Sequence, residues 1–197
     1  MTGVPLIGRI ALSPEARRRL SLRAQLLAGA TVAYNLLEAI IAIAAGRAAN
    51  SAALVGFGLD SLVEVSSGLI ILWQFRHAVP ESRERLALRL MAIAFFALAI
   101  YVSLDAARTL LGSTEPDPSS IGVILGAVSL AVMPFLSWAQ RRTGRALASG
   151  SVVADSKQTL LCTYLSAVLL VGLLLNSLLG WSWADPVAAL VIAVIAT

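Results

Sequence analysis

Long apolar segments recur along the chain, and they constrain its fold more than any other feature. A transmembrane helix needs about 20 largely apolar residues to cross the ~30 Å hydrocarbon core of a bilayer. Five such segments cover residues 24–45, 52–75, 86–111, 121–139 and 152–179. A sixth apolar segment begins at Trp183 and continues to Thr197. Hydrophobic residues make up 58% of the sequence and charged residues 13%, whereas soluble domains have about a quarter charged residues. The sequence therefore predicts an all-α membrane protein with six transmembrane helices, which excludes a soluble enzyme.

The arginines predict how these helices are oriented. Twelve of the fifteen cationic residues lie before the first segment, between or beside the second and third, or between the fourth and fifth. Connections rich in lysine and arginine stay in the cytoplasm, so both chain ends are expected there. This placement explains the net charge of +4 without a nucleic-acid partner. We expect a multi-pass integral protein of a bacterial inner membrane.

The two ends of the chain carry further signals. Ser13, Pro14 and Glu15 form a typical helix start, with a hydroxyl cap followed by proline at the first helical position. We expect residues 1–23 to be a cytoplasmic segment with a short helix, and residues 24–197 to be the six-helix transmembrane domain. The fifteen residues from Trp183 extend only ~22 Å as a helix, so the sixth helix is expected to be truncated. Asp185, directly before Pro186, is interpreted as its N-cap.

Two carboxylates stand near the middle of the second segment. Asp60 and Glu64 are four residues apart, which places them on one face of a helix. No lysine or arginine lies in the middle of any segment to neutralise them. Such a pair either holds a proton or binds a cation. A protonated pair that hydrogen-bonds neighbouring helices is the alternative to a functional site.

Gln158 and Cys162 repeat the four-residue spacing in the fifth segment. A lone cysteine in a helix is usually a small buried hydrophobic residue. If the second and fifth helices face each other, however, the two pairs supply four ligands to one divalent metal ion. Cys162 as the nucleophile of an intramembrane hydrolase would need a base nearby, and the only histidine, His77, is predicted in a cytoplasmic loop.

Three more polar residues are candidates for a cation path. Glu38 lies deep in the first segment with Asn35 about one turn away, and both either line a cation path or form interhelical hydrogen bonds. Asp155, near the predicted cytoplasmic interface, either guides incoming cations or favours the start of the fifth helix.

These motifs resemble those of a known family of transporters. Asn50–Leu54 followed by Asp60–Glu64 is similar to the second helix of the cation diffusion facilitators. Arg141–Thr143, Ala154–Asp155 and the Gln158/Cys162 pair resemble that family's fourth-to-fifth connection and fifth helix. Further similarity comes from Asn35 and Glu38 in the first helix, and from Trp183–Pro186 with Ala188–Leu190 in the sixth. The resemblance covers roughly residues 30–197 and is closest to short members without a cytoplasmic C-terminal domain.

The resemblance implies a metal site at Asp60, Glu64, Gln158 and Cys162. The family usually has aspartate at the first two positions and a histidine and an aspartate at the last two, so three positions differ. A Cys162 thiolate would keep the site's charge and favour zinc, cadmium or another soft metal, whereas the Gln158 amide is a weak ligand or orients a neighbour.

The activity implied is efflux of a zinc-like divalent cation by alternating access, as a metal/proton antiporter and homodimer. No enzymatic activity and no organic cofactor are expected. The alternative is a metal-binding membrane scaffold or sensor that has the same fold and transports nothing.

Overall fold

The computed structural model describes residues 13–76, 80–111 and 116–195, and this part of the chain is built from helices. The loop assigned to His77 lies outside the described residues. One short 3-10 helix, Pro80–Arg83, precedes the third of six α-helices. The α-helices are α1 (Pro14–Ala48), α2 (Ala52–Phe75), α3 (Glu84–Leu111), α4 (Ser120–Leu147), α5 (Gly150–Leu179) and α6 (Ala184–Ile195). The predicted all-α membrane architecture with six helices is confirmed.

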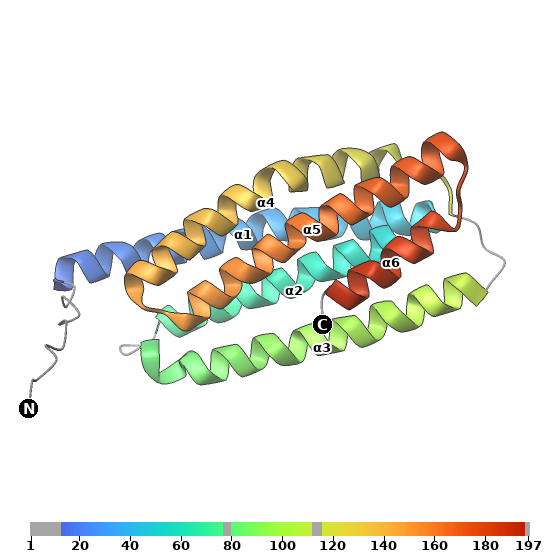
Figure 1. Ribbon diagram of the computed structural model, residues 1–197. Coiled ribbons are helices and arrows are strands. Elements are labelled where there is room, and N and C mark those ends of the chain that lie inside the picture. Colours follow the sequence, from blue (N-terminus) through green and yellow to red (C-terminus); the bar gives the residue numbers. More distant parts are fainter. Residues whose placement is uncertain (1–12, 77–79, 112–115, 196–197) are drawn as a thin grey trace, which may run out of the picture.

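The helices run side by side in an elongated bundle, with α2 near its centre (Figure 1). Helix α1 packs mainly on α2 and also on α4, while α5 packs on α4, α6 and α2. Helix α3 lies along the edge of the bundle against α2 and α6. Because α2 contacts α1, α3, α5 and α6, a side chain on α2 can reach most of the bundle interior.

Large apolar side chains cover much of the surface of the bundle. Four described helices, α1, α2, α4 and α5, are long and apolar enough to cross a membrane. Large apolar side chains face outward, with Leu26 74% exposed and Phe135 70% exposed, while many polar side chains are buried. Apolar outside and polar inside is the pattern expected when lipid replaces water as the solvent.

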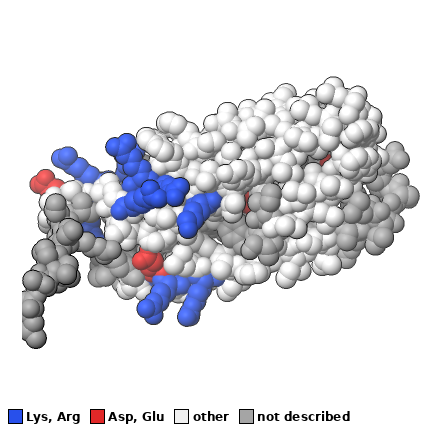
Figure 2. Space-filling model, in the orientation of Figure 1, with Lys and Arg blue, Asp and Glu red and all other residues white. Residues whose placement is uncertain are grey.

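Arginines mark one end of the bundle. Ser13 accepts a hydrogen bond from the Ala16 N–H, as expected for an N-cap, and α1 runs unbroken from Pro14 into the apolar segment. Figure 2 shows that lysine and arginine side chains gather at the end of the bundle where α1 begins. The positive-inside rule places this end in the cytoplasm, so α2 runs inward and α5 runs outward.

Asp185 does not cap α6, in contrast to the prediction. Helix α6 begins at Ala184, so Asp185 lies in its first turn. The Asp185 carboxylate instead accepts hydrogen bonds from the Ser51 hydroxyl and from the Ala53 N–H, at 3.2 Å for the latter. The first backbone N–H groups of α2 have no partners within the helix. One of them, the Ala53 N–H, donates to the Asp185 carboxylate of the neighbouring helix α6. Asp185 therefore fixes the outer end of α2 to α6.

Glycines allow α1 and α2 to approach closely. A Cβ atom on Gly58 would lie 2.8 Å from Ile43 Cγ1 and 3.0 Å from the Ile43 backbone nitrogen. Such contacts need displacement of a helix backbone, because real Cβ atoms do not approach so closely. By contrast, a Cβ atom on Gly29 of α1 would meet no atom within 4 Å. Gly58 thus sets the spacing of α1 from the part of α2 that carries Asp60.

We predict that Gly58→Ala destabilises the protein and that Gly29→Ala does not. Overpacking of this kind costs about 1–3 kcal/mol, whereas alanine at an open helical position is neutral or slightly favourable. Thermal unfolding of both variants in the same detergent measures the difference. Equal unfolding temperatures for the two variants would contradict the close α1–α2 approach.

Candidate metal centre

Asp60 and Glu64 lie on the buried face of α2. Both side chains are almost inaccessible, although each is a carboxylate. The predicted four-residue spacing on one helix face is present, because residues 52–75 form a single regular helix. Its interior-facing residues are small as well as acidic, including Ser61, Ser67 and Gly68, and this leaves room for neighbouring helices to come near.

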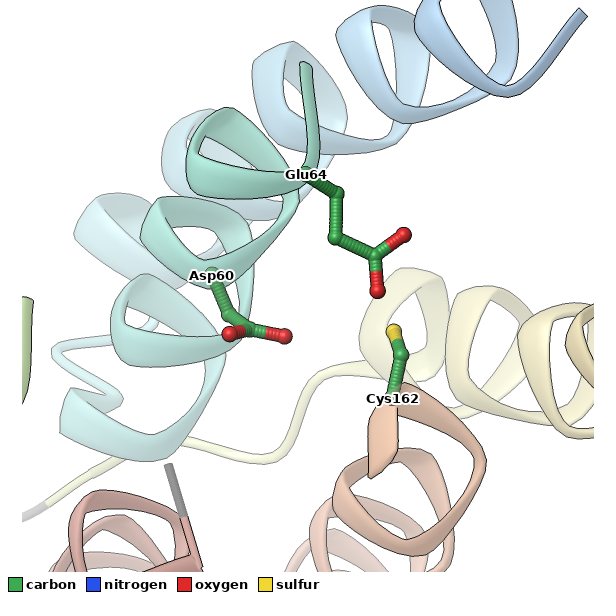
Figure 3. A group of neighbouring side chains, drawn as sticks. All are labelled: Asp60, Glu64 and Cys162. Atoms are coloured by element: carbon green, nitrogen blue, oxygen red, sulfur yellow. The ribbon is translucent and has the colours of Figure 1, made fainter. Parts of the chain in front are cut away.

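Cys162 of α5 points toward these two carboxylates. Its sulfur and one carboxylate oxygen each of Asp60 and Glu64 all lie within 4.8 Å of one another. Figure 3 shows the three side chains extending toward a common region between α2 and α5. The sequence predicted a shared site only if the second and fifth helices face each other, and α2 and α5 do so here. We refer to Asp60, Glu64 and Cys162 as the acid–thiol cluster.

Gln158 lies about one turn before Cys162 on the same helix. Its side chain is buried, and its Nε2 atom has no hydrogen-bond partner among the residues that the structure describes. A buried amide with an unpaired donor is unusual. Gln158 thus lies about one helical turn from Cys162 inside the bundle. Its role as a ligand stays a prediction.

Asn35 of α1 contacts the acid–thiol cluster directly. Its Nδ2 atom donates a hydrogen bond of 2.5 Å to Glu64 Oε2. The sequence left Asn35 either lining a cation path or forming an interhelical hydrogen bond, and it did not identify Glu64 as the partner. The hydrogen bond brings a third helix, α1, to the candidate site.

Glu38 lies among hydroxyl groups, on the outer side of the acid–thiol cluster. Its Oε2 atom accepts from Ser61 at 2.8 Å, and its Oε1 atom accepts from Ser129 and from Tyr34, the latter at 3.4 Å. Tyr34 and Ser129 are also hydrogen-bonded to each other at 2.9 Å. The sequence did not identify Tyr34, Ser61 and Ser129 as partners of Glu38. The only sign of them in the sequence is that each is a polar residue in an otherwise apolar segment. Of the two interpretations left open for Glu38, the interhelical hydrogen bonds are present, while a place on a cation path stays a prediction.

Asp155 forms a separate polar cluster on the cytoplasmic side. Its carboxylate accepts from Ser67 at 2.6 Å and from Gln140 Nε2 at 2.9 Å. Gln140 Nε2 also lies 3.2 Å from the Thr31 hydroxyl. Asp155 is buried and links α5 to α2 and α4, rather than lying free at an interface. A role in guiding cations stays a prediction.

These contacts form three polar layers along the bundle. Thr31, Asn35 and Glu38 lie on one face of α1 because they are four and three residues apart. Each belongs to a different layer, from the Asp155 cluster through the acid–thiol cluster to the hydroxyl groups around Glu38. A polar column thus extends on both sides of the candidate metal centre inside an apolar bundle.

Comparison with known proteins assigns the chain to a family. Residues 30–197 match the family described as "Cation efflux transmembrane domain". The chain belongs to the cation efflux family. The match includes all four predicted metal-site residues and five of the six helices in full.

A curated relative gives a similar but less specific result. The chain is 25% identical over 150 residues to "Uncharacterized transporter sll1263" of Synechocystis sp.. This alignment covers 71% of the chain and 48% of the relative, so the chain spans about half the length of the curated protein that it matches.

The Asp155 cluster predicts the effect of two substitutions. Asp155→Ala removes the acceptor shared by Ser67 and Gln140 and should cost about 1–3 kcal/mol for the polar groups left unpaired. Asp155→Asn keeps one acceptor and can pair with the Gln140 amide oxygen, so its cost should be smaller. Thermal unfolding of the two variants beside the wild type tests this order. An alanine variant as stable as the asparagine variant would show that the cluster contributes little.

Proposed function

We propose that this protein exports a zinc-like divalent transition-metal ion from the cytoplasm of a bacterial cell in exchange for protons. The acid–thiol cluster is the observation that carries the proposal. It combines two carboxylates and a thiol at the centre of a bundle whose surface is apolar. Membership of the cation efflux family supports transport of a cation, and the cluster supplies the chemistry for the choice of ion.

Charge balance supports a bound cation at the cluster. Buried ionised groups are costly unless they are paired or coordinate a metal. A divalent ion would compensate two of the negative charges, and metal binding displaces protons from its ligands. When the ion leaves, protons can return to the same three groups. This exchange of metal for protons at one site is the basis for the antiport that we propose.

The ligand types support a soft or borderline metal. Zinc binds thiolate sulfur at ~2.3 Å and carboxylate oxygen at ~2.0–2.2 Å, mostly with four ligands. Tetrahedral ligands at these bond lengths are ~3.5 Å apart, so a cluster within 4.8 Å needs to contract by about 1 Å. A thiolate ligand favours zinc over magnesium or calcium.

Alternating access requires that the site opens to each side in turn. The ligands belong to two helices that run in opposite directions, α2 and α5. Movement of one against the other would open the cluster toward the cytoplasmic layer at Asp155 or toward the outer layer at Glu38. The homodimer expected from the family resemblance stays a prediction.

Transport assays in sealed vesicles test the proposal. Purified protein in liposomes should take up Zn²⁺, and uptake should be faster when the lumen is more acidic than the outside. Because protons leave as metal enters, a pH dye in the lumen should report alkalinisation after Zn²⁺ is added. Asp60→Ala should lose both signals, and Cys162→Ser should weaken them by roughly 10-fold or more.

Tyr164→Phe is the matched control, because Tyr164 is exposed on α5 only two residues from Cys162. It should transport as the wild type does. Zinc binding without uptake would favour the metal-binding scaffold. Uptake without a pH change would contradict the antiport while leaving metal transport in place.

A further inference from the structure

Two buried oxygen atoms at the acid–thiol cluster are unpaired among the residues that the structure describes. Asn35 Oδ1 and Glu64 Oε1 are both buried and lack a partner within the described part of the chain. Asn35 is 0% exposed. The two residues are themselves joined, since Asn35 Nδ2 donates to Glu64 Oε2 at 2.5 Å. The unpaired atoms therefore belong to one buried contact between α1 and α2.

Unpaired buried acceptors are costly, at about 1–3 kcal/mol each, and native proteins contain few of them. Both atoms here are oxygens with free lone pairs. A group that satisfies them must be a donor or a cation. Glu64 is already a member of the acid–thiol cluster, so a cation bound there would lie against its carboxylate group.

The Asn35 amide can bring its own oxygen to the same ion. Rotation about the Cβ–Cγ bond exchanges the positions of Oδ1 and Nδ2, which are isosteric. Oδ1 would then occupy the position of Nδ2, next to Glu64 Oε2. Two oxygens bound at right angles to an ion ~2.1 Å away lie about 3 Å apart, so the present 2.5 Å separation needs to increase only slightly.

We propose that Asn35 is a further ligand of the transported cation, donating its amide oxygen from α1. This inference rests on the proposed function of the acid–thiol cluster. It makes the site a product of three helices, and it adds a neutral oxygen donor to the two carboxylates and the thiolate. An oxygen-rich set admits cations such as Co²⁺ or Mn²⁺ in addition to softer metals.

A cobalt titration of the purified protein in detergent tests the proposal. Co²⁺ reports thiolate ligation by a charge-transfer band in the near ultraviolet, and its coordination number by the intensity of its visible bands. Asn35→Leu removes the oxygen at similar volume. We expect it to weaken Co²⁺ binding roughly 10-fold or more and to increase the visible intensity, because fewer ligands remain, while the thiolate band persists.

Asn35→Asp separates a ligand from a positioning residue. As a ligand, the aspartate oxygen replaces the amide oxygen, so binding should return to within about 10-fold of the wild type. If Asn35 only donates to Glu64, the added negative charge should make this variant bind worse than Asn35→Leu, which would overturn the proposal. Should Asn35→Leu fail to fold, this comparison is made against Asn35→Ser.

Asn176→Leu is the matched control. Asn176 is another buried asparagine, on α5, and its Nδ2 atom donates to the Pro116 carbonyl at 2.8 Å. Its loss should leave the cobalt spectrum unchanged. If Asn35→Leu changes neither the spectrum nor the affinity, Asn35 is not a ligand, but the metal site at the acid–thiol cluster stands. By contrast, a wild type without the thiolate band, or an Asp60→Ala variant that binds like the wild type, would refute the metal site itself.

Discussion

Two buried carboxylates in a bundle whose apolar segments carry no basic residue in their middle constrain this structure most. Asp60 and Glu64 lie inside α2, and no lysine or arginine occurs in the middle of the segments that surround them. Their charge must be cancelled by protons or by a cation, because the bilayer offers no other counter-charge. The same requirement explains why a thiol and several amide and hydroxyl groups converge on this depth of the bundle. Under the proposed function, transport and stability would thus depend on the same residues.

The rest of the fold holds α2 in register with its neighbours. Gly58 allows α1 to approach the α2 segment that carries Asp60, and Asp185 ties the outer end of α2 to α6. At the cytoplasmic side, Asp155 links α5 to α2 and α4. These polar links lie above and below the acid–thiol cluster, so a shift of α5 against α2 must break or exchange one of them.

Apolar length predicted the helices, and four-residue spacing predicted the pairs within α2 and α5, whereas the meeting of the two pairs was implied by the family resemblance. A four-residue separation fixes a helix face wherever the helix is placed, so Asp60 with Glu64, and Gln158 with Cys162, could be paired in advance. Contacts between helices depend on rotation and depth, which spacing does not determine. Asn35 with Glu64, Ser129 with Glu38 and Gln140 with Asp155 were therefore not assigned. Asp185 was misinterpreted for the same reason, since a tertiary partner outweighed a local capping preference.

X-ray absorption at the zinc edge of the purified, zinc-loaded protein tests the central claim most directly. One cation held between α2 and α5 predicts a single sulfur neighbour at ~2.3 Å together with oxygen or nitrogen neighbours at ~2.0–2.2 Å. The sulfur contribution should vanish in Cys162→Ser. A zinc environment of oxygen and nitrogen alone in the wild type, or one that this substitution leaves unaltered, would contradict a metal centre at the acid–thiol cluster.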